Sequence, residues 1–369
     1  MSNVKNEKNN AALESIKAGL KSLAFPLVAI IISIFVAVFF VMWAKGYSIL
    51  QYFSALSNLF SIIWSGSFGD ARKTMATLEY VTPLIFTGVA HAIAFKTGLF
   101  NIGVEGQFIM GMIAAAAIGV IPGLSPVIHV PLIIFGGILA GGLWAAIPGY
   151  LKAKVGTNEV INTIMMNYIG MYLANWIILR SPLAVKGKAS TPLIQKSAEL
   201  FRFNDLSRAN ISIFIGIAFA LLAYWILWKS TTGYELRAVG INPYGAEYGG
   251  ISIAKNTILA MVLSGAIAGV GGATHVAGIF HQAQDFMGFP GFGFDGIAVA
   301  LLAKSNPIGC IASAVLFGAL NSSSKMLQLN GIPKQIVYLI QSIVIIFVAT
   351  DYIVKYFTEK KKKEAMING

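Results

Sequence analysis

The chain has 369 residues, of which 56% are hydrophobic and only 11% are charged, and its mean hydropathy is +0.73. Several apolar runs approach the roughly 20 residues that a helix needs to cross a bilayer, so the composition excludes an ordinary soluble protein and indicates a polytopic membrane protein. The single cysteine and four isolated histidines without zinc spacing exclude a disulfide framework and give no reason to expect a metal site.

The formal net charge of +12 is concentrated near the two ends of the chain. Basic residues that flank apolar spans mark cytoplasmic ends and also contact anionic headgroups, which argues against a nucleic-acid partner. The polar N-terminal segment is too long for the charged region of a cleaved signal peptide. We therefore expect a cytoplasmic N-terminal segment (1–22), a single transmembrane domain (23–354) and a basic cytoplasmic tail (355–369). The basic residues are Lys5, Lys8, Lys17, Lys21, Lys355 and Lys360–Lys363.

Hydropathy predicts an all-α polytopic membrane protein with about nine or ten transmembrane segments and both termini in the cytoplasm. Segment 294–304 is too short to span at 1.5 Å per residue, so we expect a half helix there. Small residues spaced four apart, at 137–141 and 265–269, predict close contact between helices. The apolar segments are 23–44, 81–97, 103–121, 128–149, 158–179, 211–228, 256–277, 294–304, 307–325 and 333–354.

This topology places the connections 150–157 and 229–255 in the cytoplasm, and it places 45–80, 180–210 and 278–293 outside. The external loop 180–210 is basic, against the general tendency of external loops. Its positive side chains suit an interaction with a soluble partner. They are Arg180, Lys186, Lys188, Lys196, Arg202 and Arg208.

The first polar interruption is residues 98–107 (GLFNIGVEGQ), between two apolar runs. A break in helicity near lipid persists only if it is buried in protein or lines a watery cavity, and an ionisable group there indicates a functional site. The alternative is a short turn in which Asn101 is an N-cap and Glu105 lies in the first helical turn. On the first interpretation, Asn101, Glu105 and Gln107 line a substrate pathway.

A second polar stretch, 156–169, opens the predicted span 158–179. Asn158 and Asn162 are four residues apart, so they lie on one face of a helix and could face the same cavity. The alternative is hydrogen bonding between helices, which averages under about 1 kcal/mol.

The cytoplasmic stretch 230–253 predicts a short surface helix, Pro243–Tyr248. Asn242 precedes a proline at the first helical position, and Gly249 and Gly250 follow the helix. The helix is either part of a plain loop or a docking element whose exposed tyrosines anchor a partner.

Two motifs bear on nucleotide binding. The chain has no GxxxxGK[ST] phosphate loop, so it cannot hold ATP in that way. Residues 291–296 (GFGFDG) match the GxGxxG fingerprint, but no acidic residue follows within 307–325, where the fingerprint needs one. We interpret these glycines as a bend that leads into the half helix. Asp295 lies near its start, with both a capping and a pore-lining explanation.

Residues 98–107, 156–169, 240–250 and 296–307 occur in the order found in permeases of the branched-chain amino acid/ribose/nucleoside class of ABC importers, and the chain resembles that family over 78–347. The 156–169 stretch and the long N-terminal extension most resemble nucleoside (guanosine-type) permeases. The resemblance implies a multi-pass protein of the bacterial cell membrane and no enzyme activity. It also implies that 230–253 is the loop that couples the permease to its ATPase. The expected coupling residues are Gly240, Asn242, Pro243, Tyr244, Ala246, Tyr248 and Gly250.

The resemblance further implies a heterodimeric pore with a second permease subunit, a cytoplasmic ABC ATPase and an extracellular substrate-binding lipoprotein. No cofactor is expected in this chain, because partner subunits would bind ATP. The function predicted is the translocation path for nucleosides in an ATP-driven importer. The alternatives are the same kind of permease for a sugar, a branched-chain amino acid or another small solute, an ion-coupled secondary transporter that uses Glu105 as a relay, and a nonenzymatic membrane scaffold.

Overall fold

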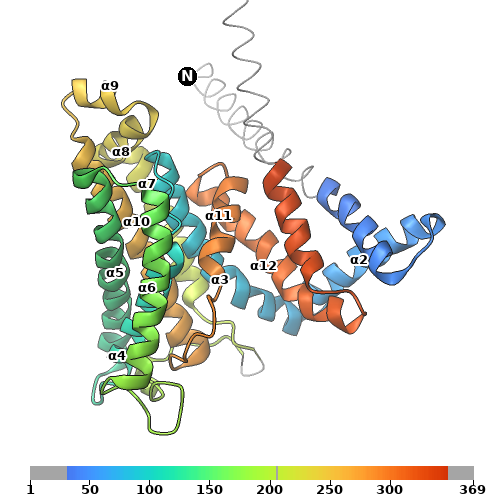
Figure 1. Cartoon of the computed structure of the whole chain (residues 1–369). Coiled ribbons are helices and arrows are strands. Elements are labelled where there is room, and N and C mark those ends of the chain that lie inside the picture. Colours follow the sequence, from blue (N-terminus) through green and yellow to red (C-terminus); the bar gives the residue numbers. More distant parts are fainter. Residues whose placement is uncertain (1–30, 205–206, 348–369) are drawn as a thin grey trace, which may run out of the picture. The chain divides into compact units, whose positions relative to one another are not determined.

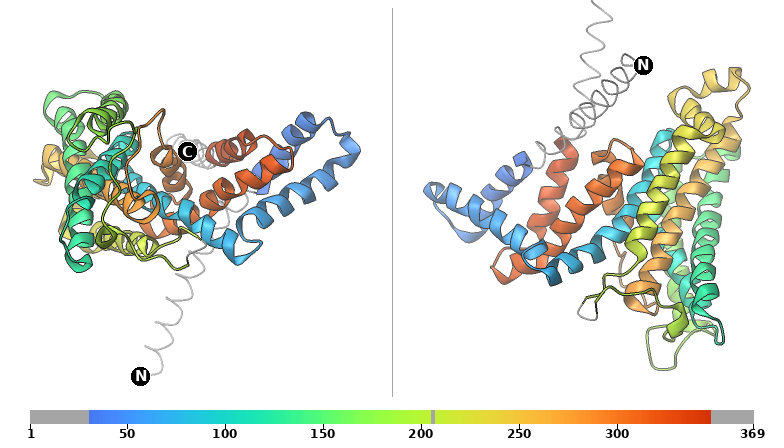
Figure 2. Two further views of the ribbon diagram at one scale, coloured as in Figure 1. Left: turned by 90° about the horizontal axis from the view of Figure 1, so that it is seen from below. Right: turned by 180° about the vertical axis from the view of Figure 1, so that it is seen from behind.

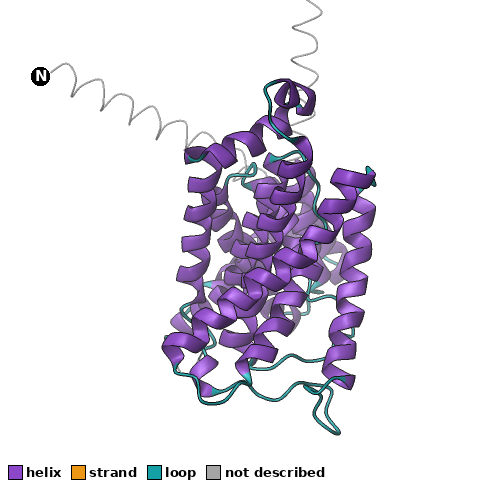
Figure 3. Cartoon of the chain, turned by 90° about the vertical axis from the view of Figure 1, so that its left-hand side faces the viewer, coloured by secondary structure: helices purple, strands orange, loops and turns teal. Residues whose placement is uncertain are grey.

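The computed structural model describes residues 31–204 and 207–347, and within them the chain is helical, with two isolated β-bridges and no strand (Figures 1 and 3). The all-α fold class is confirmed. The chain divides into two units, 1–64 with 323–369 and 65–322, and we describe each by itself. The predicted cytoplasmic segment 1–22 and the tail 355–369 with Lys360–Lys363 lie outside the described residues, so their sidedness stays a prediction.

The first unit contains the apolar helices Ile31–Lys45 and Gln335–Phe347. Between the first of these and α2 (Tyr52–Ser67) lies a short 3₁₀ helix, η1 (Ile49–Gln51), which is capped by Ser48. Lys45 Nζ donates to the backbone carbonyl of Asn330 at 2.6 Å.

The second unit begins with α3 (Ala71–Lys96), which starts ten residues before the predicted span 81–97. Asp70 is its N-cap and accepts the backbone N–H of Lys73 at 2.8 Å, a bond that lowers the pKa of the Asp70 carboxyl. Hydropathy missed this first part of the helix because three of its side chains, Arg72, Lys73 and Glu79, are charged.

The remaining helices follow the predicted order. Five long apolar helices, Ala71–Lys96, Pro126–Val155, Ser212–Lys229, Ile253–Phe280 and Pro307–Leu329, are long and apolar enough to cross a membrane. With four shorter apolar helices and α6, they match the ten predicted segments in position. The elements are α4 (Val104–Gly119), α5 (Pro126–Tyr150) with η2 (Leu151–Val155), α6 (Glu159–Arg180), η3 (Lys196–Ala198), α7 (Ser212–Lys229), α8 (Thr231–Ile241), α9 (Pro243–Tyr248), α10 (Ile253–His275) with η4 (Val276–Phe280), α11 (Phe292–Leu302) and α12 (Pro307–Leu329).

Helix α10 is the central element of this unit, with α3, α4 and α5 packed around it. The predicted glycine arrays make its contact with α5. A Cβ added at Gly141 would collide with the carbonyl of Gly265, and one added at Gly269 would collide with that of Gly137. Small residues therefore let these two backbones touch, where van der Waals contact replaces the hydrophobic effect.

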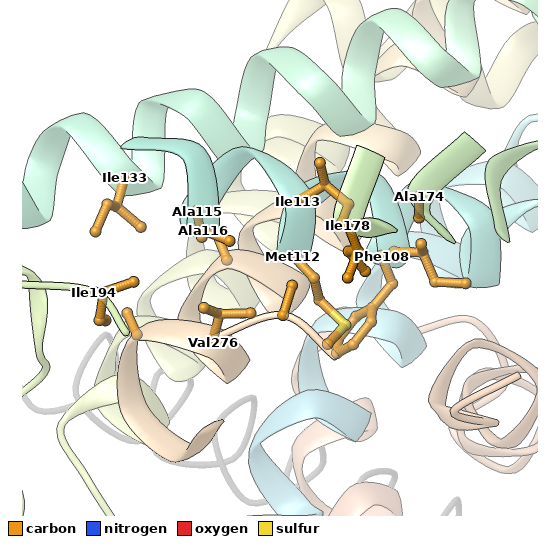
Figure 4. Close-up of a cluster of buried hydrophobic side chains, with 14 of the residues drawn as sticks. Phe108, Met112, Ile113, Ala115, Ala116, Ile133, Ala174, Ile178, Ile194 and Val276 are labelled. Carbon is orange, nitrogen blue, oxygen red and sulfur yellow. The ribbon is translucent and has the colours of Figure 1, made fainter. Parts of the chain in front are cut away.

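A cluster of buried apolar side chains joins α4 to its neighbours (Figure 4). Phe108 and Met112 come from α4, Ile133 from α5, and Ile178 from α6. Ile194, in the connection after α6, closes the cluster at one end. Apolar contact thus positions α4, and with it the polar turn that precedes α4.

Helix α9 and the loop that follows α6 lie at opposite ends of the second unit. Figures 1 and 2 show α9 at one end of α5, α6 and α10, and the loop that follows α6 at the other. That loop is joined to the segment after η4: the backbone N–H of Thr191 donates to Ala283, and that of Ile194 to His281. Arg202 also donates to His281 Nε2, and burial lowers the pKa of His281, which keeps that nitrogen unprotonated and able to accept the bond.

We expect Gly141→Ala to lower the stability of the folded protein by about 1–3 kcal/mol, because the new methyl group must separate α5 from α10. Cys310 is buried, so unfolding in detergent can be followed with a thiol-reactive fluorophore. Gly142→Ala is the matched control, since its Cβ would meet nothing closer than 3.5 Å. Equal midpoints for the two variants would contradict the packing argument.

Cysteines placed at Lys186 and Tyr248 should be labelled from opposite sides of the membrane. Lys186 lies in the loop that follows α6 and Tyr248 is the last residue of α9, and these two elements lie at opposite ends of the second unit (Figure 1). The experiment uses a Cys310→Ser background and an impermeant maleimide on intact cells. We expect Lys186→Cys to react from outside and Tyr248→Cys to react only after permeabilisation. The reverse pattern would invert the predicted orientation.

Candidate functional site

The turn 97–103 between α3 and α4 is buried in protein. Asn101 is fully buried, its Oδ1 accepts the backbone N–H of Gly103 at 3.0 Å, and its Nδ2 donates to Gln107 Oε1 and to Ser264 Oγ at 3.1 and 2.9 Å. The suggestion that Asn101 is the N-cap of α4 is wrong, because Gly103 occupies that position and has no capping side chain. Asn101 instead joins the turn to α4 and to α10.

Glu105 lies in the first turn of α4 and is fully buried. Its Oε1 accepts the backbone N–H of Gly291 at 2.6 Å, and its Oε2 accepts that of Gly293 at 2.5 Å. These donors belong to the start of α11, where helix N–H groups have no partner within the helix. Glu105 therefore caps a different helix, α11, whose first bonded residue, Gly291, lies 186 residues later in the chain.

His91 of α3 completes this arrangement. Its Nε2 donates to the carbonyl of Gly293 at 2.8 Å, so both backbone groups of Gly293 are bound by buried side chains. A Cβ at Gly293 would collide with the backbone of Glu105, and Gly291 has a φ of +92°. No side chain fits at Gly293, and the positive φ at Gly291 favours glycine there. We call Glu105, His91, Gly291 and Gly293 the Gly293 clamp.

The clamp fixes a short helix, which confirms the half helix predicted at 294–304. Helix α11 packs along α3 through small residues, since Cβ atoms at Gly296 and Gly88 would meet Thr87 and Val299. Among the residues that the structure describes, no strand precedes 291–296, whereas a dinucleotide-binding site would need one there. Asp295 accepts from Asn321 Nδ2 at 2.9 Å and so bonds to α12, not to the start of its own helix.

Asn167 of α6 makes a second connection, which the sequence analysis missed as a site residue. Its Oδ1 accepts the backbone N–H of Gly106 at 2.8 Å, and its Nδ2 donates to the carbonyl of Ile102 at 2.9 Å. The signal in the sequence was an amide within the otherwise apolar run 164–169. We call this pair of bonds the Asn167 latch.

The structure divides the five predicted pathway residues into two groups. Asn101, Glu105 and Gln107 are buried around the start of α4. Asn158 is exposed and caps α6 through the backbone N–H of Val160 at 2.9 Å. Asn162 donates to the Thr157 hydroxyl, within the same turn. Contact of any of them with substrate stays a prediction.

The predicted surface helix is present as α9, with the predicted bounds. Asn242 caps it by accepting the backbone N–H of Gly245 at 3.1 Å, and Gly250, with a φ of +82°, follows its end. Tyr244 and Tyr248 are 81% and 97% exposed. These two rings are the large exposed aromatic groups of α9.

Two residues of the predicted coupling set face inward. Ala246 is buried, so a bulky replacement there would disturb α9 itself. Gly240 lies against the end of α3, where its Cβ would collide with the carbonyl of Lys96, and a Cβ at Gly98 would come within 3.3 Å of Gly240. The α8–α9 segment thus touches the turn that leads to the Gly293 clamp.

Comparison with known proteins identifies the family of the chain. The family model described as "Branched-chain amino acid transport system / permease component" matches residues 74–349. The chain belongs to this family. It is therefore a permease, a multi-pass protein of the bacterial plasma membrane.

Three named relatives match most of the chain. The guanosine ABC transporter permease protein NupP of Bacillus subtilis (strain 168) is 40% identical over 94% of this chain and 98% of its own length. The nucleoside ABC transporter permease protein NupB of Lactococcus lactis subsp. cremoris (strain MG1363) is 34% identical over 91% and 93%. The glucose ABC transporter permease protein TsgB13 of Haloferax volcanii is 29% identical over 76% and 77%.

We expect Glu105→Gln to destabilise the permease by about 1–3 kcal/mol, because an amide offers one oxygen to two backbone donors and leaves one buried N–H unpaired. Substrate uptake should fall but persist. Thermal unfolding and uptake are measured together. Glu79→Gln is the control, since Glu79 bonds the backbone of Arg208 at an exposed position. Complete loss of uptake at unchanged stability would support the proton-relay alternative.

Proposed function

We propose that this chain is the transmembrane permease subunit of an ATP-driven importer and forms the translocation path for nucleosides. The observation that carries the proposal is the match of NupP and NupB, named for guanosine and nucleosides, at 40% and 34% identity over nearly the full length. The half helix α11, held by buried polar groups, supports a role as part of a pathway. Irregular backbone at membrane depth occurs where it is buried in protein or lines a cavity.

The two ends of the second unit offer surfaces for the partners that we propose. An ABC ATPase would dock at α9 through Tyr244 and Tyr248, since exposed aromatic side chains commonly carry interface binding energy. A substrate-binding lipoprotein would approach the opposite end, where Lys186, Lys188 and Lys196 are exposed. A second permease subunit would complete the pore.

Transport by alternating access requires that ATP and substrate each favour one of two states of the pore. The contacts that support a connection run from α9 through α8 to the turn after α3, and from there to the Gly293 clamp. Gly240 against Lys96 and Gly98 is the first contact. Movement of α8 would therefore reach Glu105 through covalently linked residues of a single turn.

The proposal is tested by purifying the permease with its co-expressed partners and measuring guanosine uptake into proteoliposomes that contain ATP. We expect ATP-dependent uptake that is insensitive to a protonophore at constant ATP. Uptake that collapses with the protonophore would replace the ABC proposal with an ion-coupled transporter. The similarity to TsgB13 makes glucose the second candidate, and competition by glucose but not by guanosine would support it.

Replacing Tyr244 and Tyr248 together with alanine should reduce the amount of ATPase that co-purifies by at least about tenfold, since hot-spot side chains contribute 2 kcal/mol or more. Membrane insertion should be unchanged, because both rings are exposed. Tyr150→Ala, at a tyrosine 55% exposed outside the segment, is the control. Normal ATPase recovery from the double variant would exclude α9 as the docking element.

A further inference from the structure

Three aromatic side chains gather on the surface beside the half helix. They are Tyr168 of α6, Phe289 of the segment before α11, and Phe294 of α11. The rings of Tyr168 and Phe289 lie edge to face with centroids 5.0 Å apart, and those of Phe289 and Phe294 lie the same way at 5.5 Å. Tyr168 is 45% exposed and Phe294 37%. We call these three residues the aromatic platform.

The depth of Tyr168 argues that this surface does not face lipid. At 1.5 Å per residue, Tyr168 lies about 14 Å from the first residue of α6 and about 18 Å from its last. Its hydroxyl has no hydrogen-bond partner in the part of the chain that the structure describes. A hydroxyl without a partner at mid-depth in hydrocarbon costs several kcal/mol, of order 4–8 by transfer to an alkane. A wet pathway removes that cost.

Helix α5 shows what the lipid-facing surface of this protein looks like. The exposed residues at comparable depth there are Leu132, Phe135, Leu139 and Leu143, all without polar atoms in the side chain. The amides of α6 lie on its inner face, and its exposed face carries Tyr168 and Tyr172 among apolar side chains. Helix α6 thus presents phenol hydroxyls at a depth where the exposed face of α5 has no polar atom.

The platform is held from both sides by the buried polar contacts described above. Tyr168 directly follows Asn167, whose side chain forms the Asn167 latch, and Phe294 directly follows Gly293 of the clamp. The rings of the aromatic platform are therefore fixed relative to α4. A rigid aromatic surface loses little entropy when a flat ligand stacks on it.

We propose that the aromatic platform binds the base of a nucleoside in transit. Bases stack on aromatic side chains whatever their identity, because every base has a π face. The Tyr168 hydroxyl is available to the polar edge of the base. The platform would thus be a weak, base-tolerant transit site. This inference rests on the proposed nucleoside function.

The test compares variants of the platform in the complete importer, reconstituted with both permeases, the ATPase and the binding protein. Radiolabelled guanosine is the probe. We expect Tyr168→Leu and Phe294→Leu each to lower uptake about tenfold, the size of one base–aromatic stacking contact. Tyr168→Phe keeps the ring and should stay within about threefold of wild type, in line with the loss of one hydrogen bond. The matched control is Phe135→Leu, a 54% exposed ring at similar depth on α5, which should transport like wild type.

Photolabelling supplies a measurement that does not depend on turnover. Light-activated 8-azidoguanosine should modify peptides that carry Tyr168, Phe289 or Phe294, and excess guanosine should prevent it. Labelling elsewhere only, or leucine variants that transport like Phe135→Leu, would overturn the platform. Loss of the second permease from purified Tyr168→Leu would make the surface an assembly interface and also overturn it. A wild-type importer that carries no nucleoside would overturn the proposed function itself.

Discussion

The two hydrogen bonds from the Glu105 carboxylate to Gly291 and Gly293 are the contact on which the half helix depends. A helix that begins inside a membrane protein exposes four backbone N–H groups without partners, and hydrocarbon cannot supply them. A buried carboxylate provides two acceptors, and its charge suits the positive end of the helix. Without such a group, α11 could not begin at this depth, and the break between the loop and the helix would have to move to the surface.

The clamp and the latch also determine how the helices of the second unit are joined. Apolar and glycine contacts pack α4, α5 and α10 into one block. Hydrogen bonds from Asn167 and Glu105 tie α6 and α11 to the start of α4. They add to the apolar contact of Ile178 and to the glycine contacts between α11 and α3. These directional bonds fix the backbone beside Tyr168 and Phe294, which directly follow Asn167 and Gly293 in the chain.

The sequence predicted the secondary elements better than the pairings between them. Hydropathy located ten segments, and proline and glycine around 243–250 located α9, because both signals are local. The beginning of α3 was missed because charged residues conceal a helix from hydropathy. The partner of Glu105 could not be predicted from the sequence. A glutamate in this turn is compatible with a helix cap and with a pathway lining. Nothing in the neighbouring residues indicates that it caps a helix 186 residues later. The inward direction of Ala246 was missed for the same reason.

The same hydrogen bonds bear on where a substrate can bind. A ligand that donated a hydrogen bond to Glu105 would have to displace Gly291 or Gly293, leaving a buried N–H unpaired at a cost of about 1–3 kcal/mol. Asn101 and Gln107 are similarly occupied by each other and by Ser264. Groups without such commitments bind at no structural cost, and at this depth the Tyr168 hydroxyl and its neighbouring rings are of that kind. A pathway that receives its substrate from a binding protein needs weak, quickly reversed contacts. Stacking on a fixed aromatic surface provides them, whereas a ligand at Glu105 would first have to replace the bonds that hold the start of α11.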